Sequence, residues 1–60
     1  MYFQNLPQEF QERIINGLKK DLKNLARAEG YNCNNEYIDD YINRNNDHDT
    51  VRNWINCYCL

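Results

Sequence analysis

The feature that most constrains this chain is a run of apolar residues at helical spacing, which occupies more than a third of its length. Between Pro7 and Gly30 these residues recur at three- and four-residue steps, and they are Phe10, Ile14, Leu18, Leu22 and Leu25. Pro is favoured in the first turn of a helix and Gly just after the last turn. The spacing therefore predicts one long amphipathic helix over residues 7–29.

Two shorter apolar stripes follow in the second half of the chain. The first predicts a helix over residues 35–45, and its apolar members are Tyr37, Ile38, Tyr41 and Ile42. The second predicts a helix over residues 48–58, and its apolar members are Val51, Trp54, Ile55 and Tyr58. Asn and Asp side chains cap helix N-termini. Suitable residues stand at the start of both helices, namely Asn34 or Asn35, and Asp47 or Asp49.

Together these patterns predict an all-α fold in which residues 1–60 form one small bundle of three helices. A chain of this length buries only about 60% of the surface that its unfolded form exposes. Two short helices would leave part of the long apolar stripe uncovered, so we expect that a homodimer completes the cover. Gly17 lies inside the long helix, where Gly costs about 1 kcal/mol relative to Ala. It marks either a close approach by another helix or a bend.

Charge is distributed unevenly along the chain, whose net charge is −2. Residues 1–29 carry five basic and four acidic side chains, whereas residues 30–60 carry two basic and five acidic ones. Because DNA attracts proteins through Lys and Arg, the acidic second half favours a protein partner over a nucleic acid. The residues expected to form this acidic partner-binding surface are Glu36, Asp39, Asp40, Asp47 and Asp49.

The long predicted helix carries a basic stripe opposite its apolar one. Arg13, Lys20 and Arg27 repeat every seven residues, and Lys23 lies beside them. Such a stripe binds an acidic protein surface or a nucleic acid in some proteins. Solvated charged faces of amphipathic helices show the same pattern, and we favour this second interpretation.

Segment 37–56 resembles a helix-turn-helix motif, with a short helix, a turn containing Asn, a cap and a second helix. The resemblance implies an alternative function, DNA binding, with the second helix in the major groove. Its outward residues would then contact bases: Arg52 suits guanine, and Asn53 or Asn56 suits adenine. His48 and Asp49 would lie beside them.

The segment departs from the motif at three places. Tyr41 stands where the motif has a small residue, and Asn46 stands where a hydrophobic residue of the turn normally enters the core. Asp47 and Asp49 would face DNA phosphates at the helix N-terminus, where like charges repel. These departures favour a core role for the last helix and leave DNA binding as the alternative.

The sequence predicts a protein that is not an enzyme and has no cofactor or metal. It contains a single His, no Ser and no Gly-rich loop, and so short a chain hardly encloses the recess that a general acid needs. The odd number of cysteines, Cys33, Cys57 and Cys59, favours reduced thiols. Two alternatives stay open: a zinc ion held by these thiols and His48, or a disulfide from Cys33 to Cys57 or Cys59. Two residues apart on a helix, Cys57 and Cys59 would diverge by about 200°.

Location and origin are also suggested by the sequence. No apolar run approaches the roughly 20 residues that span a bilayer, and the N-terminus lacks the pattern of a secretion signal. We therefore expect a cytoplasmic protein without a membrane partner. Eleven Asn residues, with many Ile, Lys and Tyr, indicate an AT-rich gene. Composition and length resemble those of short proteins carried by phages and mobile elements, which implies an inhibitor or adaptor that blocks a host complex sterically.

Overall fold

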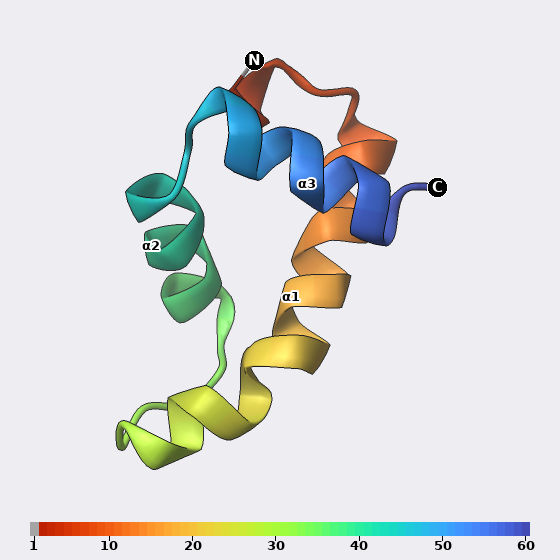
Figure 1. Ribbon diagram of the computed structural model, residues 1–60. Helices are drawn as coiled ribbons and strands as arrows, with labels where there is room; N and C mark the ends of the chain where they lie inside the picture. The colour runs from red at the N-terminus through yellow and green to blue at the C-terminus, as the bar shows by residue number, and fades with distance from the viewer. Residues whose placement is uncertain (1) are drawn as a thin grey trace.

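The computed structural model describes residues 2–60 as three α-helices preceded by a short 3-10 helix (Figure 1). The elements are η1 (Phe3–Asn5), α1 (Gln8–Ala28), α2 (Asn35–Arg44) and α3 (His48–Tyr58). The predicted all-α fold, with one long and two short helices, is confirmed. Each predicted boundary agrees with the structure to within one residue, and the described part of the chain contains no strand.

The C-terminus of α1 is closed by the backbone of the residues that follow it. Gly30 has a φ of 83°, the left-handed conformation that glycine adopts most readily. The N–H of Tyr31 donates to the carbonyl of Ala26 at 2.8 Å, and that of Gly30 donates to the carbonyl of Arg27 at 3.1 Å. These are the two hydrogen bonds of a Schellman motif. They end the helix and turn the chain back toward α2.

The two short helices are capped by side chains of the residues that precede them. The Oδ1 atom of Asn34 accepts from the N–H of Tyr37 at 2.9 Å at the start of α2. At the start of α3, Asp47 Oδ1 accepts from the Thr50 N–H at 2.9 Å, and Asp47 Oδ2 accepts from the Thr50 hydroxyl at 3.0 Å. Of the candidates named from the sequence, Asn34 and Asp47 are therefore the caps.

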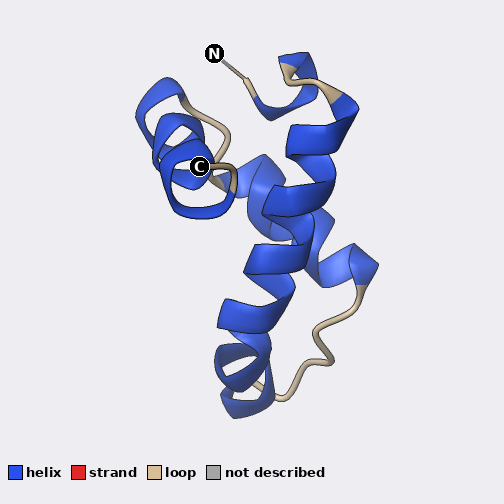
Figure 2. Ribbon diagram, turned by 90° about the vertical axis from the view of Figure 1, so that its right-hand side faces the viewer, coloured by secondary structure: helices blue, strands red, loops and turns tan. Residues whose placement is uncertain are grey.

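The core lies where α3 crosses the N-terminal half of α1, with α2 packed on α1 as well (Figures 1 and 2). Its buried side chains come from every element of the structure: Phe3, Ile14, Leu18, Ile38, Ile42, Val51, Trp54 and Cys59. The apolar stripe predicted for α3 faces this core, since Val51 and Trp54 are buried and Ile55 and Tyr58 pack against them. Trp54, at the centre of the last helix, therefore belongs to the core.

Gly17 marks a close approach between α1 and α3. The ring of Tyr58 lies against the Gly17 backbone, so that a Cβ atom at position 17 would overlap the ring. The Tyr58 hydroxyl then donates to Asp21 Oδ2 at 2.5 Å. Burial, and after it the hydrogen bond to this carboxylate, raise the pKa of Tyr58 above its ordinary value. Of the two explanations for Gly17, the close approach is the correct one.

The sequence did not predict η1, which is held by contacts from distant parts of the chain. The N–H of Phe3 donates to Asn46 Oδ1 at 2.8 Å, and Asn46 Nδ2 donates to Gln4 Oε1 at 2.7 Å. The Phe3 ring meets the Trp54 ring edge-on, with centroids 6.3 Å apart. One amide in the turn between α2 and α3 thus fastens the N-terminal segment over the core.

The C-terminal half of α1 extends past α3 and is less well covered (Figure 1). Leu25 lies seven residues after Leu18, on the same face of the helix, yet it is 47% exposed whereas Leu18 is 3% exposed. Tyr31, just beyond the helix, is exposed as well. Part of the apolar stripe is therefore uncovered, and the homodimer that would cover it stays a prediction.

Candidate functional site

The first candidate surface is the outward face of α2. Ile38 and Ile42 point into the core, and the opposite side of the helix carries Glu36, Asp39 and Asp40, all of them exposed. Helical periodicity puts these three carboxylates on one side of α2. The structure thus brings together three of the five residues expected in an acidic surface.

Two of the five acidic residues have partners within their own segment. Asp40 Oδ2 lies 3.0 Å from Arg44 Nη2 one turn later on α2. Asp47 caps α3, and the hydrogen bonds from Thr50, first from its backbone N–H and then from its hydroxyl, lower the pKa of Asp47. Asp47 is therefore a structural residue, whereas Asp49, in the first turn of α3, is exposed.

The second candidate surface is the outward face of α3, which carries the residues of the DNA-binding alternative. Arg52, Asn53 and Asn56 are all exposed, on the side of the helix opposite Val51 and Trp54. The structure therefore places the three expected base-contacting side chains on one surface.

Two departures from the helix-turn-helix pattern have structural reasons. Tyr41, where the motif has a small residue, packs its ring on Trp54 with centroids 6.4 Å apart. Asn46, where the motif has a turn hydrophobe, uses its amide to hold Phe3 and Gln4 of η1. Tyr41 and Asn46 thus hold different segments of this fold together. The short turn between α2 and α3, which the motif also has, is retained.

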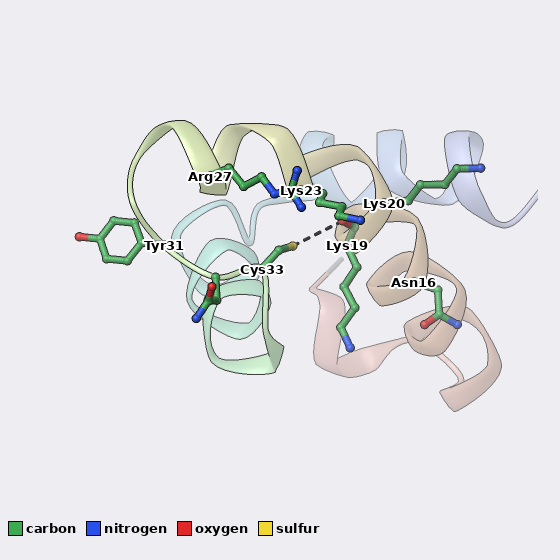
Figure 3. A pocket seen from close by; sticks show the side chains of 8 residues that line it. Asn16, Lys19, Lys20, Lys23, Arg27, Tyr31 and Cys33 are labelled. Atoms are coloured by element: carbon green, nitrogen blue, oxygen red, sulfur yellow. Dashed lines mark hydrogen bonds between the residues drawn. The ribbon is translucent and has the colours of Figure 1, made fainter.

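A third surface lies along the C-terminal half of α1. An open groove of about 550 Å³ runs between this part of the helix and the loop that follows it (Figure 3). Its walls carry four basic side chains from successive turns of α1 together with residues of the returning loop. We term it the basic groove and define it by Lys19, Lys20, Lys23, Arg27, Tyr31 and Cys33.

The basic groove differs from the basic stripe expected from the sequence in four residues, namely Arg13, Lys19, Tyr31 and Cys33. Arg13 does not line it, because its Nη2 atom lies 2.8 Å from Glu9 Oε1 and its Nη1 atom donates to the carbonyl of Cys59 at 3.4 Å. Lys19 was missed, although the clustering of basic residues between positions 19 and 27 was visible in the sequence. The contribution of Tyr31 depends on the reversal of the chain after α1, which periodicity does not reveal.

The three cysteines are free thiols in separate surroundings. Cys57, in the last turn of α3, is exposed and Cys59, just after the helix, is buried, so their side chains diverge as expected. Cys59 Sγ donates to the carbonyl of Phe10 at 3.7 Å, and burial is the main cause that raises its pKa. Within residues 2–60, no three His, Cys, Asp or Glu side chains are grouped so that they could hold a metal ion.

Comparison of the chain with protein-family models, with curated proteins and with solved structures finds no significant match. Among the described residues, no helix combines the length and the apolar character needed to cross a membrane.

Proposed function

We propose that the protein is a non-enzymatic module that binds another protein through the outward face of α2 and the first turn of α3. The observation that carries this proposal is the separation of charge on the fold. The exposed carboxylates of Glu36, Asp39 and Asp40 lie on one face of α2, and four basic side chains line the groove on α1. A surface of one sign favours a partner surface of the opposite sign.

The chemistry of the acidic face supports a partner with a basic surface. Glu36, Asp39 and Asp49 are exposed carboxylates, which attract a cationic surface from a distance and raise the rate of association. The pair of Asp40 and Arg44 is solvent-exposed on both sides, and such pairs contribute about 0–1 kcal/mol. A Lys or Arg of the partner can therefore displace Arg44 from Asp40 at little cost.

The proposed mechanism is steric. A rigid three-helix body whose apolar side chains are used mainly for its own core presents a polar face to the partner, and it occupies a site that another ligand of the partner needs. If the gene comes from a phage or mobile element, as the composition suggests, the role is that of an inhibitor or adaptor acting on a host complex. A basic surface that normally binds nucleic acid fits the charge of this face.

The decisive experiment compares charge reversals on two helices. Asp39→Lys together with Asp40→Lys should weaken the binding of a partner captured from the source cell, and it should reduce the dependence of the affinity on salt. Glu12→Lys on α1 is the control, because it reverses an exposed carboxylate far along the chain from α2. Circular dichroism should show that every variant keeps its helix content. Unchanged affinity and salt dependence in the α2 variant would exclude the proposal.

A second candidate function, DNA binding through α3, is favoured by one observation. Arg52, Asn53 and Asn56 share the exposed face of α3, where the second helix of a helix-turn-helix presents its base-contacting residues. Under this alternative, Arg52→Ala and Asn53→Ala abolish binding to duplex DNA and leave the helix content intact. A mobility-shift assay at low salt in which no duplex is retarded by the wild-type protein would eliminate it.

A further inference from the structure

The basic groove on α1 is the most strongly charged part of the molecule that the proposed function leaves unused. Lys19, Lys20, Lys23 and Arg27 line it, and they extend over about 12 Å of helix. Figure 3 shows these side chains leaving the same stretch of α1. Four cations within about two turns repel one another, so a bound polyanion would relieve this repulsion.

An exposed aromatic ring stands at one end of this groove. Tyr31 is 62% exposed, and Figure 3 shows its ring pointing outward, at the end of the groove away from Asn16. Its position is set by the turn at Gly30, whose φ is 83°, and by its own backbone hydrogen bond to Ala26 at 2.8 Å. One side of the ring is supported by Tyr37, with centroids 6.2 Å apart.

The groove is held in shape before any ligand binds. Cys33 in the returning loop donates from Sγ to the carbonyl of Lys19 at 3.4 Å, a contact drawn in Figure 3. Ala26 is fully buried, and its carbonyl accepts from the N–H of Tyr31, which ties the start of the same loop to the helix. Asn16 and Asn32 add side-chain amides at the edges of the groove. Little backbone conformational entropy is therefore lost when a ligand is bound.

We propose that the basic groove binds single-stranded nucleic acid, with the cations of α1 on successive phosphates and the ring of Tyr31 stacked on a base. Single-strand-binding proteins combine these two features, a positively charged groove along the backbone and an aromatic side chain for the bases. An acidic peptide would also satisfy the cations, but its carboxylate side chains offer no flat ring to Tyr31. The combination of charge and aromatic platform therefore favours the nucleic acid.

The neighbouring acidic face limits the strand to a short segment. Tyr31 and Asn32 also line a second depression, whose other walls include Glu36 and Asp40. Arg44 also lines this depression and pairs with Asp40, which leaves one negative charge, so phosphates that continued past Tyr31 would be repelled. The bound strand therefore ends at Tyr31, and binding involves only the few nucleotides that the groove accommodates.

Fluorescence anisotropy of a labelled oligo(dT) tests the proposal at low ionic strength. Lys23→Glu and Arg27→Glu should each weaken binding about tenfold or more, and Lys23→Gln should have a smaller effect. Arg13→Glu, which changes the net charge of the protein by the same amount at a position of α1 outside the groove, is the matched control and should change the affinity by less than about twofold. The slope of log affinity against log salt should decrease by about 0.7 for each cation removed.

The aromatic contact is tested separately. Tyr31→Ala should weaken oligo(dT) binding about fivefold to a hundredfold, the usual range for loss of one stacked base, whereas Tyr31→Phe should retain it. Asp39→Lys should retain or strengthen it, so this inference and the proposed function fail independently. Circular dichroism should confirm that each variant is folded.

Three results would overturn the inference. The first is no binding of oligo(dT) by the wild-type protein at low salt. The second is an equal loss of affinity in Arg13→Glu and Lys23→Glu, which would indicate that binding responds only to the net charge of the protein. The third is equal competition by a polyglutamate peptide together with no effect of Tyr31→Ala, which would show that the groove takes acidic peptides instead.

Discussion

Leu18 and Leu25 occupy the same face of α1, one heptad apart, and their surroundings are opposite. Leu18 is 3% exposed and belongs to the core, whereas Leu25 is 47% exposed. Around Leu18 the helix is covered by α3, which crosses the N-terminal half of α1 (Figures 1 and 2) and lays Tyr58 against Gly17. Around Leu25 the helix has passed beyond α3. We refer to these two halves of α1 as the packed end and the open end.

The difference follows from the small size of the chain. After α1 only two short helices remain, and Tyr41 of α2 and Trp54 of α3 lie at the packed end, where Trp54 contacts the rings of Phe3 and Tyr41. At the open end, only the start of α2 and the returning loop cover the helix. The packed end therefore specifies the fold. The open end is free to carry the charged groove, because its exposed residues are not needed for the core.

The largest expected effect comes from the same substitution made at both ends. Leu18→Ala should lower the free energy of unfolding by about 2–5 kcal/mol, the usual range for a buried Leu. Leu25→Ala should change it by about 0.5 kcal/mol or less, as for most surface substitutions. Urea unfolding followed by circular dichroism measures both. Equal losses would mean that the open end is covered in solution, and light scattering would then test the expected homodimer.

The second effect concerns the helix contact at the packed end. Gly17→Ala forces a methyl group into the ring of Tyr58, and overpacking of this kind costs about 1–3 kcal/mol. The better helix propensity of Ala returns about 1 kcal/mol, so we expect a net loss of stability. Asn24→Ala, at an exposed position near the open end, should instead stabilise the protein by a few tenths of a kcal/mol.

A double-mutant cycle isolates the cause of the Gly17 effect. In a Tyr58→Ala background the ring is absent, so Gly17→Ala should become neutral or stabilising by up to about 1 kcal/mol. If Gly17→Ala destabilises both backgrounds by the same amount, the ring is not the reason for glycine at this position.

The helices could be predicted because their signals are local. The apolar stripes, the caps at Asn34 and Asp47 and the stop at Gly30 all lie within a few residues of the structure that they specify. The segment η1 could not be predicted, because its backbone is held by Asn46, 43 residues away from Phe3. The role of Gly17 was left open for the same reason, since only the fold shows that Tyr58 lies against it.

The candidate surfaces were predictable to different degrees. The acidic face of α2 follows from periodicity alone, and the pair of Asp40 and Arg44 follows the i, i+4 rule for helices. The basic groove was visible only in part. Its helical side is a local pattern, but its other wall contains Tyr31 and Cys33, which reach α1 through the chain reversal after the helix.

The smallest of the three effects concerns the hydroxyl of Tyr58 at the packed end. Tyr58→Phe removes the hydrogen bond to Asp21 and should lower the free energy of unfolding by about 1 kcal/mol at neutral pH. Tyr31→Phe at the open end removes an exposed hydroxyl and should leave stability unchanged. Thermal or urea unfolding of the two variants makes this a matched comparison of the two ends.

Tyr58→Phe and Tyr31→Phe also test how the unfolding free energy changes at alkaline pH. Because the fold raises the pKa of Tyr58, chiefly by burial, the folded state favours the neutral phenol. This contribution is fully present below the unfolded-state pKa of about 10 and is lost as the pH rises above it. Unfolding free energy should therefore fall above about pH 10, and it should fall less steeply in Tyr58→Phe than in the wild type. Tyr31→Phe should follow the wild-type curve. Parallel curves for the wild type and Tyr58→Phe would show that the phenol of Tyr58 ionises as freely in the folded protein as in the unfolded chain. Burial at the packed end would then not hinder its ionisation.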